Sequence, residues 1–229
     1  APVGAKCVPL AAGGGGGGQG VGWRGARGRV SVLGGGVAGL CAARVAAGMG
    51  ADVTVFDVDV ARMRYIDEVW GGRIGTRFSS PLAVREACGE SDVVIGSVLV
   101  PGARTPHLVD HEMVLGMVPG SVLVDVAVDQ GGCFEDSHPT THADPTFVVG
   151  GSVFYCVANM PGAVPHTSTY ALTDATMRYV LLLADEGWRG ACGSRDDLRR
   201  GLATCGGKLV SAPVGEALGI ECVPVSEVL

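Results

Sequence analysis

Residues Val30–Leu40 read VSVLGGGVAGL, and this stretch decides the fold. A short apolar run with β-branched residues leads directly into Gly34, Gly35 and Gly36, and Gly39 follows three residues later. The run has the composition of a buried strand, and the residues after the glycines suit a helix. Glycines at such a junction permit a tight turn and close packing of the helix on the strand. The stretch therefore predicts a strand that turns sharply into a helix.

The same alternation continues along the chain. From Arg29 onward, strand-like runs that are apolar almost throughout alternate with helix-compatible stretches. This pattern is typical of a parallel sheet that is covered by helices on both faces. We predict an α/β fold, a doubly wound parallel sheet of Rossmann-like type, over residues 29–165.

The two ends of the chain depart from this alternation. Residues 1–28 are glycine-rich and of low complexity, which is typical of a linker or of a remnant of a larger unit. Residues 166–229 begin with hydroxyl residues that can cap a helix, and we expect a C-terminal helical segment there, in pieces broken by Gly206 and Gly207. Its first helix places an apolar face that includes Leu172 at helical spacing, and this face needs a partner.

Composition and charge exclude several classes of protein. With 47% hydrophobic and 17% charged residues the chain is not disordered, and a net charge of −6 gives no basic surface for nucleic acid. No apolar run approaches the roughly 20 residues that span a bilayer, and no signal segment opens the chain, so we predict no membrane partner. The eight scattered cysteines include no CxxC pair, which indicates reduced thiols and a cytoplasmic location.

The glycines match a dinucleotide-binding pattern. Gly34, Gly36 and Gly39 form G-x-G-x-x-G, in which the first glycine permits the turn, the second lets a pyrophosphate approach, and the third lets helix and strand pack closely. The helix that starts near Val37 directs free N–H groups and its positive dipole end toward that phosphate. Asp57 ends the next strand at the spacing expected for a carboxylate that binds ribose hydroxyls, which favours NAD over NADP.

Other polar residues have more than one interpretation. Arg62 can serve a 2′-phosphate, lie along an adenosine, or face solvent. Asp129 follows an expected strand over 121–128, where it either orients or protonates a substrate beside the nicotinamide, or only initiates a turn with Gly131. Asn159 offers a carboxamide that can hold a nicotinamide or a substrate.

The histidine-rich segment does not predict a metal site. His138, His142 and Asp144 invite that interpretation, but Pro139 and Pro145 make the segment a loop, and no Glu general base lies between the histidines. We therefore expect no metal cofactor.

Taken in order, VLGGGVAG, VIGSVLVPGA, VDVAVDQGGCFE, PTTHADPTF, YCVANMPGAVP and TSTYALT resemble the alanine dehydrogenase family, from about residue 29 to the C-terminus. The resemblance implies reversible oxidative deamination of L-alanine to pyruvate and ammonia with NAD as cofactor, in a homo-oligomer. It implies these roles: Gly34, Gly36 and Gly39 at the pyrophosphate, Asp57 at the adenosine ribose, Arg62 and Ser79 near the adenosine, Val98 and Leu99 lining the cofactor cleft, Asn159 and Met160 flanking the nicotinamide, and Asp129 as the catalytic carboxylate.

The chain departs from this family in one large respect. Family members carry an N-terminal substrate domain that supplies an arginine, a lysine and a histidine, and residues 1–28 match that domain poorly. In the family, the C-terminal helices fold back onto it. A desolvated substrate carboxylate needs a cation, yet residues 29–165 contain no lysine, and Arg104 has no identified role. We expect the cofactor half of an enzyme, which binds NAD(H) without appreciable alanine turnover. The alternatives are a stand-alone NAD-binding module or pseudoenzyme, and an enzyme for another amino or imino acid.

Overall fold

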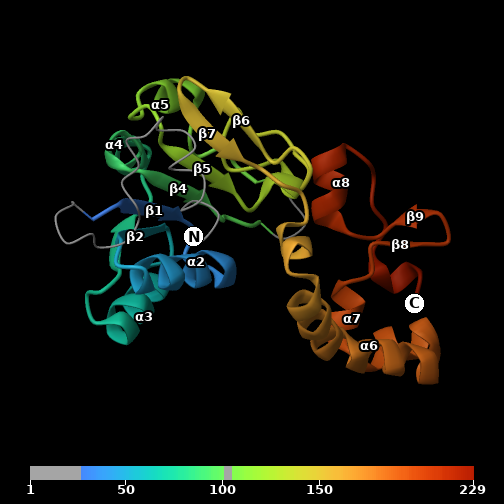
Figure 1. Cartoon of the computed structure of the whole chain (residues 1–229). Helices are drawn as coiled ribbons and strands as arrows, with labels where there is room; N and C mark the ends of the chain where they lie inside the picture. Colours follow the sequence, from blue (N-terminus) through green and yellow to red (C-terminus); the bar gives the residue numbers. More distant parts are fainter. Residues whose placement is uncertain (1–26, 101–104) are drawn as a thin grey trace. The chain divides into compact units, whose positions relative to one another are not determined.

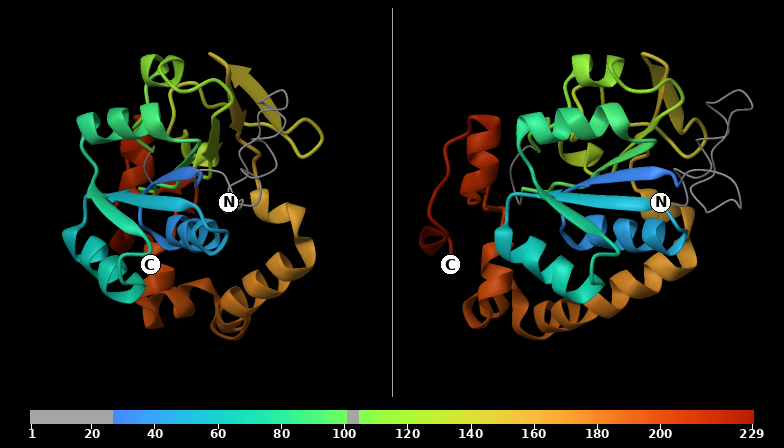
Figure 2. Two further views of the ribbon diagram at one scale, coloured as in Figure 1. Left: turned by 60° about the vertical axis from the view of Figure 1, so that its left-hand side comes forward. Right: turned by 90° about the vertical axis from the view of Figure 1, so that its left-hand side faces the viewer.

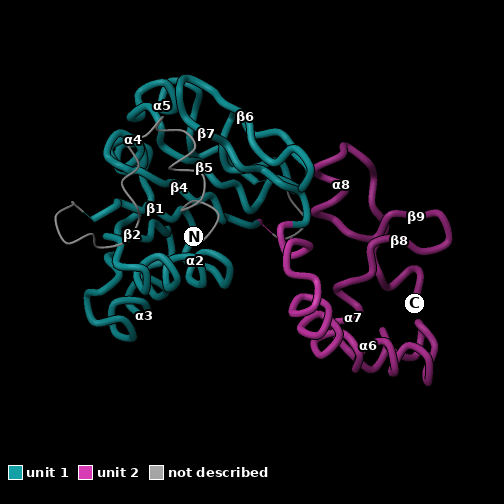
Figure 3. Tube along the Cα trace, viewed as in Figure 1, with its two compact units in different colours: residues 1–99, 105–159 teal, residues 100–104, 160–229 magenta. Residues whose placement is uncertain are grey.

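A computed structural model describes residues 27–100 and 105–229, so the leader up to residue 26 and Arg104 lie outside the described residues. The chain divides into two compact units (Figure 3). Unit 1 comprises residues 1–99 and 105–159, and unit 2 comprises residues 100–104 and 160–229. Residues 160–165, which the sequence analysis placed with the nucleotide-binding domain, cluster with unit 2.

A seven-stranded sheet in the order β3-β2-β1-β4-β5-β7-β6 forms the centre of unit 1 (Figure 1). All neighbouring strands pair in parallel except β6, which pairs antiparallel with β7. The strands are β1 Arg29–Leu33, β2 Asp52–Asp57, β3 Gly75–Phe78, β4 Val93–Gly96, β5 Val122–Asp125, β6 Thr146–Val149 and β7 Ser152–Tyr155. The order runs in opposite directions from β1 and β4, which is the arrangement of a doubly wound sheet. The predicted fold class is confirmed, with an antiparallel edge strand that the sequence analysis did not anticipate.

Helices cover both faces of this sheet. Figure 2 shows α2 and α3 on one face and α4 and α5 on the other. The helical elements of unit 1 are α2 Val37–Gly48, α3 Val60–Trp70, α4 Pro81–Glu90, α5 His111–Leu115 and the 3₁₀ turn η1 Val128–Gln130. No helix among the described residues has both the length and the apolar character that a bilayer crossing requires.

Local sequence signals explain where the helices begin and end. The Asp59 side chain accepts hydrogen bonds from the first amides of α3, and Gly71 ends that helix in the left-handed conformation at φ 52°. Ser80 caps α4 in the same way, with Pro81 at the first helical position. These caps fix where each helix starts relative to the strand before it, and so fix the loops at the edge of the sheet.

The core of unit 1 lies between the sheet and these helices. β1, β4 and β5 are buried almost throughout, as expected for central strands covered on both faces. The ring of Phe134, on the loop after β5, meets the ring of Phe154 on β7 edge to face, with 6.0 Å between centroids. The loop that follows β5 is therefore anchored in the core by Phe134, which is fully buried.

Unit 2 is mostly helical, as predicted. Its elements are η2 Met160–Ala163, α6 Pro165–Ser194, α7 Asp196–Arg200, β8 Thr204–Cys205, β9 Lys208–Leu209, α8 Ala212–Leu218 and η3 Val225–Glu227. α6 is interrupted at Gly187, whose φ of 66° and ψ of 167° are not helical. Gly206 and Gly207 lie between the helical pieces α7 and α8, as expected, but they form the two-residue turn of a β8–β9 hairpin that the sequence analysis did not anticipate.

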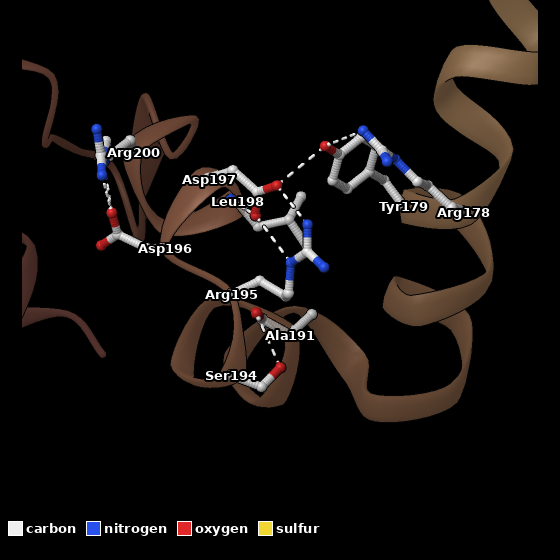
Figure 4. A network of polar contacts seen from close by, with 9 residues as sticks. All are labelled: Arg178, Tyr179, Ala191, Ser194, Arg195, Asp196, Asp197, Leu198 and Arg200. Atoms are coloured by element: carbon white, nitrogen blue, oxygen red, sulfur yellow. Dashed lines mark hydrogen bonds and ion pairs between the residues drawn. The ribbon is translucent and has the colours of Figure 1, made fainter.

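Polar contacts connect α6 to α7 within unit 2 (Figure 4). The Tyr179 hydroxyl donates to Asp197 at 2.9 Å, and Arg195 donates to both oxygens of that carboxylate. These partners hold the pKa of Asp197 well below its ordinary value, chiefly through the Arg195 hydrogen bonds. Of the predicted apolar face of α6, Leu172 is 66% exposed, whereas Tyr179 is half-buried and bound to Asp197, so the face is open in part among the described residues.

Candidate functional site

The candidate site lies at the carboxyl edge of the unit 1 sheet, where β1 and β4 end. In doubly wound sheets, ligands bind at this edge, at the point where the strand order reverses. Because β1, β2, β3, β4, β5 and β7 are parallel, the residues that follow them all lie at the same edge. Most of the residues singled out by the sequence follow one of these strands.

Two of the three motif glycines are required by the fold itself. Gly34 has φ of 98°, and a Cβ there would lie 3.0 Å from the backbone of Ser97 and Val98. A Cβ on Gly39 would overlap the Gly34 carbonyl oxygen and the Ser97 hydroxyl. The turn and the first turn of α2 therefore pack against the end of β4 with no room for a side chain, as the motif predicts.

Gly36 is different, because a Cβ there would meet nothing within 4 Å. It is the N-cap of α2, with φ of −63° that any residue adopts, and no side chain caps the helix. Among the described residues the first amides of α2 therefore have no side-chain acceptor, and the space where a Gly36 side chain would lie is open. Open space beside unpaired N–H groups at the positive end of a helix suits a phosphate group.

Asp57 ends β2 and contacts the glycine turn directly. Its Oδ2 accepts a hydrogen bond from the Gly35 amide at 2.6 Å, and its Oδ1 accepts one from the Asp59 amide at 2.9 Å. A carboxylate has further acceptor positions beyond these two bonds, so ribose hydroxyls can still donate to it. A Cβ on Gly35 would lie 3.0 Å from Asp57 Oδ2, which explains why the middle position of the three is also glycine.

Arg62 bridges α3 to the same turn. Its Nε donates to the Gly35 carbonyl at 2.5 Å, and its guanidinium lies 5.1 Å from the centre of the Tyr65 ring. The side chain therefore does not lie on a fully solvated helix face, which was one of the three interpretations. The structure places it against Gly35, whose amide binds Asp57, at the end of the turn where an adenosine would lie under the sequence hypothesis.

Ser79, Val98 and Leu99 flank this centre. The Ser79 amide donates to the Asp57 carbonyl at 2.9 Å, which places Ser79 next to Asp57 at the end of β3. Val98 is half-buried against the core and lies beside Gly34 through its backbone, and Leu99 is 56% exposed. The structure thus brings together eight predicted residues from four strand ends: Gly34, Gly36, Gly39, Asp57, Arg62, Ser79, Val98 and Leu99.

Asp129 lies at the same edge but not where the sequence placed it. The expected strand over 121–128 is too long, because β5 ends at Asp125 and the chain continues through a turn into η1. Asp129 is on η1, exposed, and makes no hydrogen bond or ion pair with any described residue. The apolar residues Val126, Ala127 and Val128 extended the apparent strand. The turn interpretation is confirmed, and the role beside a substrate stays a prediction, for which the carboxylate is exposed and unpaired among the described residues.

Asn159 and Met160 follow β7. Asn159 is exposed and has φ of 56°, the one positive φ of a described residue other than glycine, and His142 Nε2 lies 3.1 Å from its carbonyl oxygen. Met160 begins η2 and belongs to unit 2. Asn159 therefore lies at the edge of the unit 1 sheet. That Asn159 and Met160 flank a nicotinamide stays a prediction, because the two residues belong to different units.

Two residues of this edge escaped the sequence analysis. The hydroxyl of Ser97, which is buried, lies 2.9 Å from the carbonyl oxygens of both Leu33 and Gly34 and donates to them, so it ties the glycine turn to β4. Asp125, fully buried, accepts hydrogen bonds from the loop that carries Asp129. No motif marks Ser97, whereas the VDVAVDQ stretch offered Asp125 as a second carboxylate.

The thiols near the edge are unreactive by environment. Burial raises the pKa of Cys133 to about 12 and that of Cys156 to about 11, so both stay protonated at neutral pH.

His138 stacks on Phe147 at 3.8 Å between ring centres. Within residues 27–100 and 105–229, no group of three or more His, Cys, Asp or Glu side chains is arranged to hold a metal ion.

Comparisons with known proteins agree with this geometry. Alanine dehydrogenases of Mycolicibacterium smegmatis and Halomonas elongata are 58% and 54% identical to the chain, and the matches cover 87% and 88% of it. The chain spans about half the length of these relatives, 54% in each case. A solved L-alanine dehydrogenase superposes with a TM-score of 0.84 at 44% identity, over 95% of this chain and 60% of that one.

A transhydrogenase from Sinorhizobium meliloti superposes with a TM-score of 0.63 at 27% identity, over 81% of this chain and 50% of that one. The family model described as "Alanine dehydrogenase/PNT, C-terminal domain" matches residues 3–212, most of the sequence. The chain therefore belongs to the alanine dehydrogenase/PNT C-terminal domain family, a family of nicotinamide-dependent dehydrogenases.

Proposed function

We propose that this chain is the cofactor-binding portion of an alanine dehydrogenase, which binds NAD and serves the reversible oxidative deamination of L-alanine to pyruvate and ammonia. The observation that carries the proposal is the glycine turn, whose Gly36 opens onto free space beside uncapped amides of α2 while Asp57 closes the other end. The identity with alanine dehydrogenases supports the substrate.

The residues present fit a dinucleotide. The amides after Gly36 would donate to the pyrophosphate, and the free acceptor positions of Asp57 would receive the adenosine ribose hydroxyls. Asp57 carries a negative charge next to that ribose, so a 2′-phosphate would be repelled and NAD is preferred over NADP. Arg62, Ser79, Val98 and Leu99 would surround the adenosine half, and Asn159 and Met160 would flank the nicotinamide.

Asp129 is the proposed catalytic carboxylate. When bound, NAD⁺ supplies the hydride acceptor for the substrate Cα–H bond. The exposed and unpaired carboxylate of Asp129 would orient the amino group of alanine or hold a proton beside it, since no described residue competes for its oxygens. Oxidation of the amine and hydrolysis by water then yield pyruvate and ammonia.

One observation favours the second candidate, an NAD-binding module without catalysis. The described residues of unit 1 contain no lysine, and three of the arginines, Arg29, Arg77 and Arg85, are paired with Glu90, Glu86 and Asp110. Arg62, the arginine at the glycine turn, is engaged with the Gly35 carbonyl, so none of these four arginines is held ready for a substrate carboxylate. Catalysis by the 229-residue chain alone would need a cationic group from outside the described residues of unit 1. The cytoplasmic location and the homo-oligomeric state stay predictions from the sequence.

The two candidates are separated by a turnover assay. Absorbance at 340 nm would follow alanine-dependent reduction of NAD⁺ by the 229-residue chain, and by a chimera that carries the unmatched N-terminal part of the Mycolicibacterium smegmatis enzyme ahead of Arg29. We expect no appreciable turnover by the chain alone and clear turnover by the chimera, which Asp129→Asn abolishes. A folded chimera that binds NADH but does not oxidise alanine would contradict the proposed function, and turnover by the chain alone would refute the argument from the missing cation.

A further inference from the structure

Asp125 is a buried carboxylate at the end of β5 with an unusual environment. Its side chain is fully buried, and its hydrogen-bond partners are the Ala127 amide at 3.0 Å, the Cys133 amide at 2.8 Å and the Ser137 hydroxyl at 2.5 Å. No cation is among the contacts that the described residues make with it, and burial raises its pKa. A buried carboxyl group without a cation is costly, so an apolar residue at this position would pack at lower cost.

The three donors come from both ends of one loop. We call residues 127–137 the Asp129 loop, since Asp129 lies on it between the amide donors Ala127 and Cys133. Asp125 therefore closes this loop on itself, in the way that a carboxylate organises a turn through backbone N–H groups. The oxygens of Asp125 face the base of the loop, whereas the carboxylate of Asp129 is exposed and unpaired among the described residues.

The backbone of the loop is adapted to this contact. Gly132 has φ of 81°, and a Cβ there would lie 2.7 Å from Asp125 Oδ2 and 2.9 Å from the Ser137 Cβ. On its other side, the loop accepts hydrogen bonds at the Gln130 carbonyl from the Thr105 amide and at the Cys133 carbonyl from the Leu108 amide. The loop is thus held from two sides: on its inner side Phe134 is buried in the core, and the hydrogen bonds from Ala127, Cys133 and Ser137 all go to the one carboxyl group of Asp125.

The glycine turn is held by other groups. Ser97 ties it to β4, and Asp57 ties Gly35 to β2. Neither side chain is among the described hydrogen-bond partners of Asp125. A change at Asp125 should therefore act on the Asp129 loop and leave the pyrophosphate-binding turn intact. This separation makes the role of Asp125 testable by itself.

We propose that Asp125 is a positioning residue, which holds the Asp129 loop so that the Asp129 carboxylate keeps a fixed place at the ligand edge of the sheet. Its importance for catalysis rests on the proposed function of Asp129. The positioning does not rest on the proposed function, because it concerns only the conformation of the Asp129 loop in the 229-residue chain.

The first test uses the 229-residue chain and needs no turnover. The variants are Asp125→Asn, which cannot accept from all three donors, and Ser137→Ala, which removes one donor and leaves the carboxyl group. We expect Asp125→Asn to raise the rate of amide hydrogen exchange in residues 127–137 by about tenfold or more, and Ser137→Ala to raise it by less. In both variants the exchange of residues 34–46 and the affinity for NADH should stay unchanged. The amide NMR signals of Asp129 and its neighbours on the loop should shift in Asp125→Asn, whereas those of residues 34–46 should not.

A merely structural role gives a different result. In that case exchange would rise equally in residues 34–46 and 127–137, or the amide signal of Asp129 would not move, and either outcome would overturn the proposal. If Asp125→Asn does not fold, Ser137→Ala decides by the same two readouts.

The second test is a double-mutant cycle in the chimera described above. If Asp125 acts through Asp129, Asp125→Asn lowers kcat without raising KM for NAD⁺, and adding it to Asp129→Asn costs nothing further. Multiplicative losses would contradict action through Asp129. A chimera without alanine turnover would refute the proposed function, while the exchange and NMR results would still decide the role of Asp125.

Discussion

Single glycines in the turn after β1 serve different purposes. Gly39 is needed by the fold, because a Cβ there would overlap Gly34 and Ser97, whereas nothing in the described structure lies near a Cβ on Gly36. The packing of the described residues therefore does not require glycine at position 36, and we propose that a ligand does. This contrast separates the requirements of folding from those of binding within six residues of chain.

Substitution by alanine tests this contrast. We expect Gly36→Ala to keep the melting temperature and to weaken NADH binding at least about tenfold, because the added methyl group would occupy the approach of the pyrophosphate. Gly39→Ala should lower the free energy of unfolding by about 1–3 kcal/mol and weaken binding as well. Thermal melts and NADH fluorescence titrations measure both quantities.

Gly48→Ala is the matched control, since Gly48 is exposed at the end of α2 and a Cβ there meets nothing within 4 Å. It should leave NADH binding unchanged. Equal losses of affinity in Gly36→Ala and Gly48→Ala would show that Gly36 has no special relation to a ligand.

Asp57 should determine which dinucleotide is preferred. Its carboxylate already binds the Gly35 amide, so the charge is held in place beside the proposed ribose site. We expect the chain to bind NADH more tightly than NADPH, and Asp57→Asn to reduce that preference about tenfold by removing the repulsion of a 2′-phosphate. Asp52→Asn, a change of the same kind at the opposite end of β2, is the control. An unmodified chain that prefers NADPH would contradict the assignment.

At the scale of elements, the segments that could be predicted carry their signals locally. β1, the glycine turn, α2 and β2 follow from β-branched runs, glycine spacing and an alanine-rich helix, and Asp57 follows from its distance in sequence. The end of β5 could not be predicted, because apolar residues continue past it and the strand stops where Asp125 accepts hydrogen bonds from the next loop. Ser97 carries no motif, since its role arises only when β4 lies beside β1.

The two hairpins carry a local sequence signal, a Gly-Gly pair, that the sequence analysis did not use. Gly150–Gly151 joins β6 to β7, and Gly206–Gly207 joins β8 to β9, each as a two-residue loop with positive φ at both positions. Gly-Gly between two short strands is a recognised hairpin signal. The abundance of glycine in this chain hid it, so the antiparallel edge strand and the small hairpin of unit 2 were both missed.

The loop after β5 should make stability depend on pH. The pKa of Asp125 is raised by burial above its ordinary value of 3.8, so the folded chain holds this proton when the unfolded chain has released it. This contribution to stability is fully present below pH 3.8 and is lost as the pH rises through the raised pKa. Asn does not titrate. We therefore expect the melting temperature of Asp125→Asn to increase relative to that of the unmodified chain as the pH rises through this range. A constant difference between the two proteins across the acid range would contradict a raised pKa.

At the scale of the whole molecule, thiol reactivity should report which parts are packed. Burial raises the pKa of Cys88 and of Cys133 to about 12, whereas Cys41 is exposed on α2. With iodoacetamide at pH 8 we expect Cys41 to be alkylated in the folded chain, and Cys88, Cys133 and Cys156 to react only after unfolding, as read by peptide mass spectrometry. Rapid alkylation of Cys133 in the folded chain would show that the loop after β5 is not packed as described.

The two units contain different features. Unit 1 contains the glycine turn, Asp57 and Asp129, whereas unit 2 carries the partly open apolar face of α6 and the polar contacts around Asp197. Binding of the dinucleotide by unit 1 is the claim on which the proposed reaction, its cofactor preference and the role of Asp129 all depend.

The most direct test of that claim is an amide NMR titration of the 229-residue chain with NADH. The account predicts saturable shifts that are largest at the amides of Gly36, Val37 and Ala38, with further shifts at Gly35 and Asp57. Absence of binding, or shifts that leave the start of α2 unaffected, would contradict it.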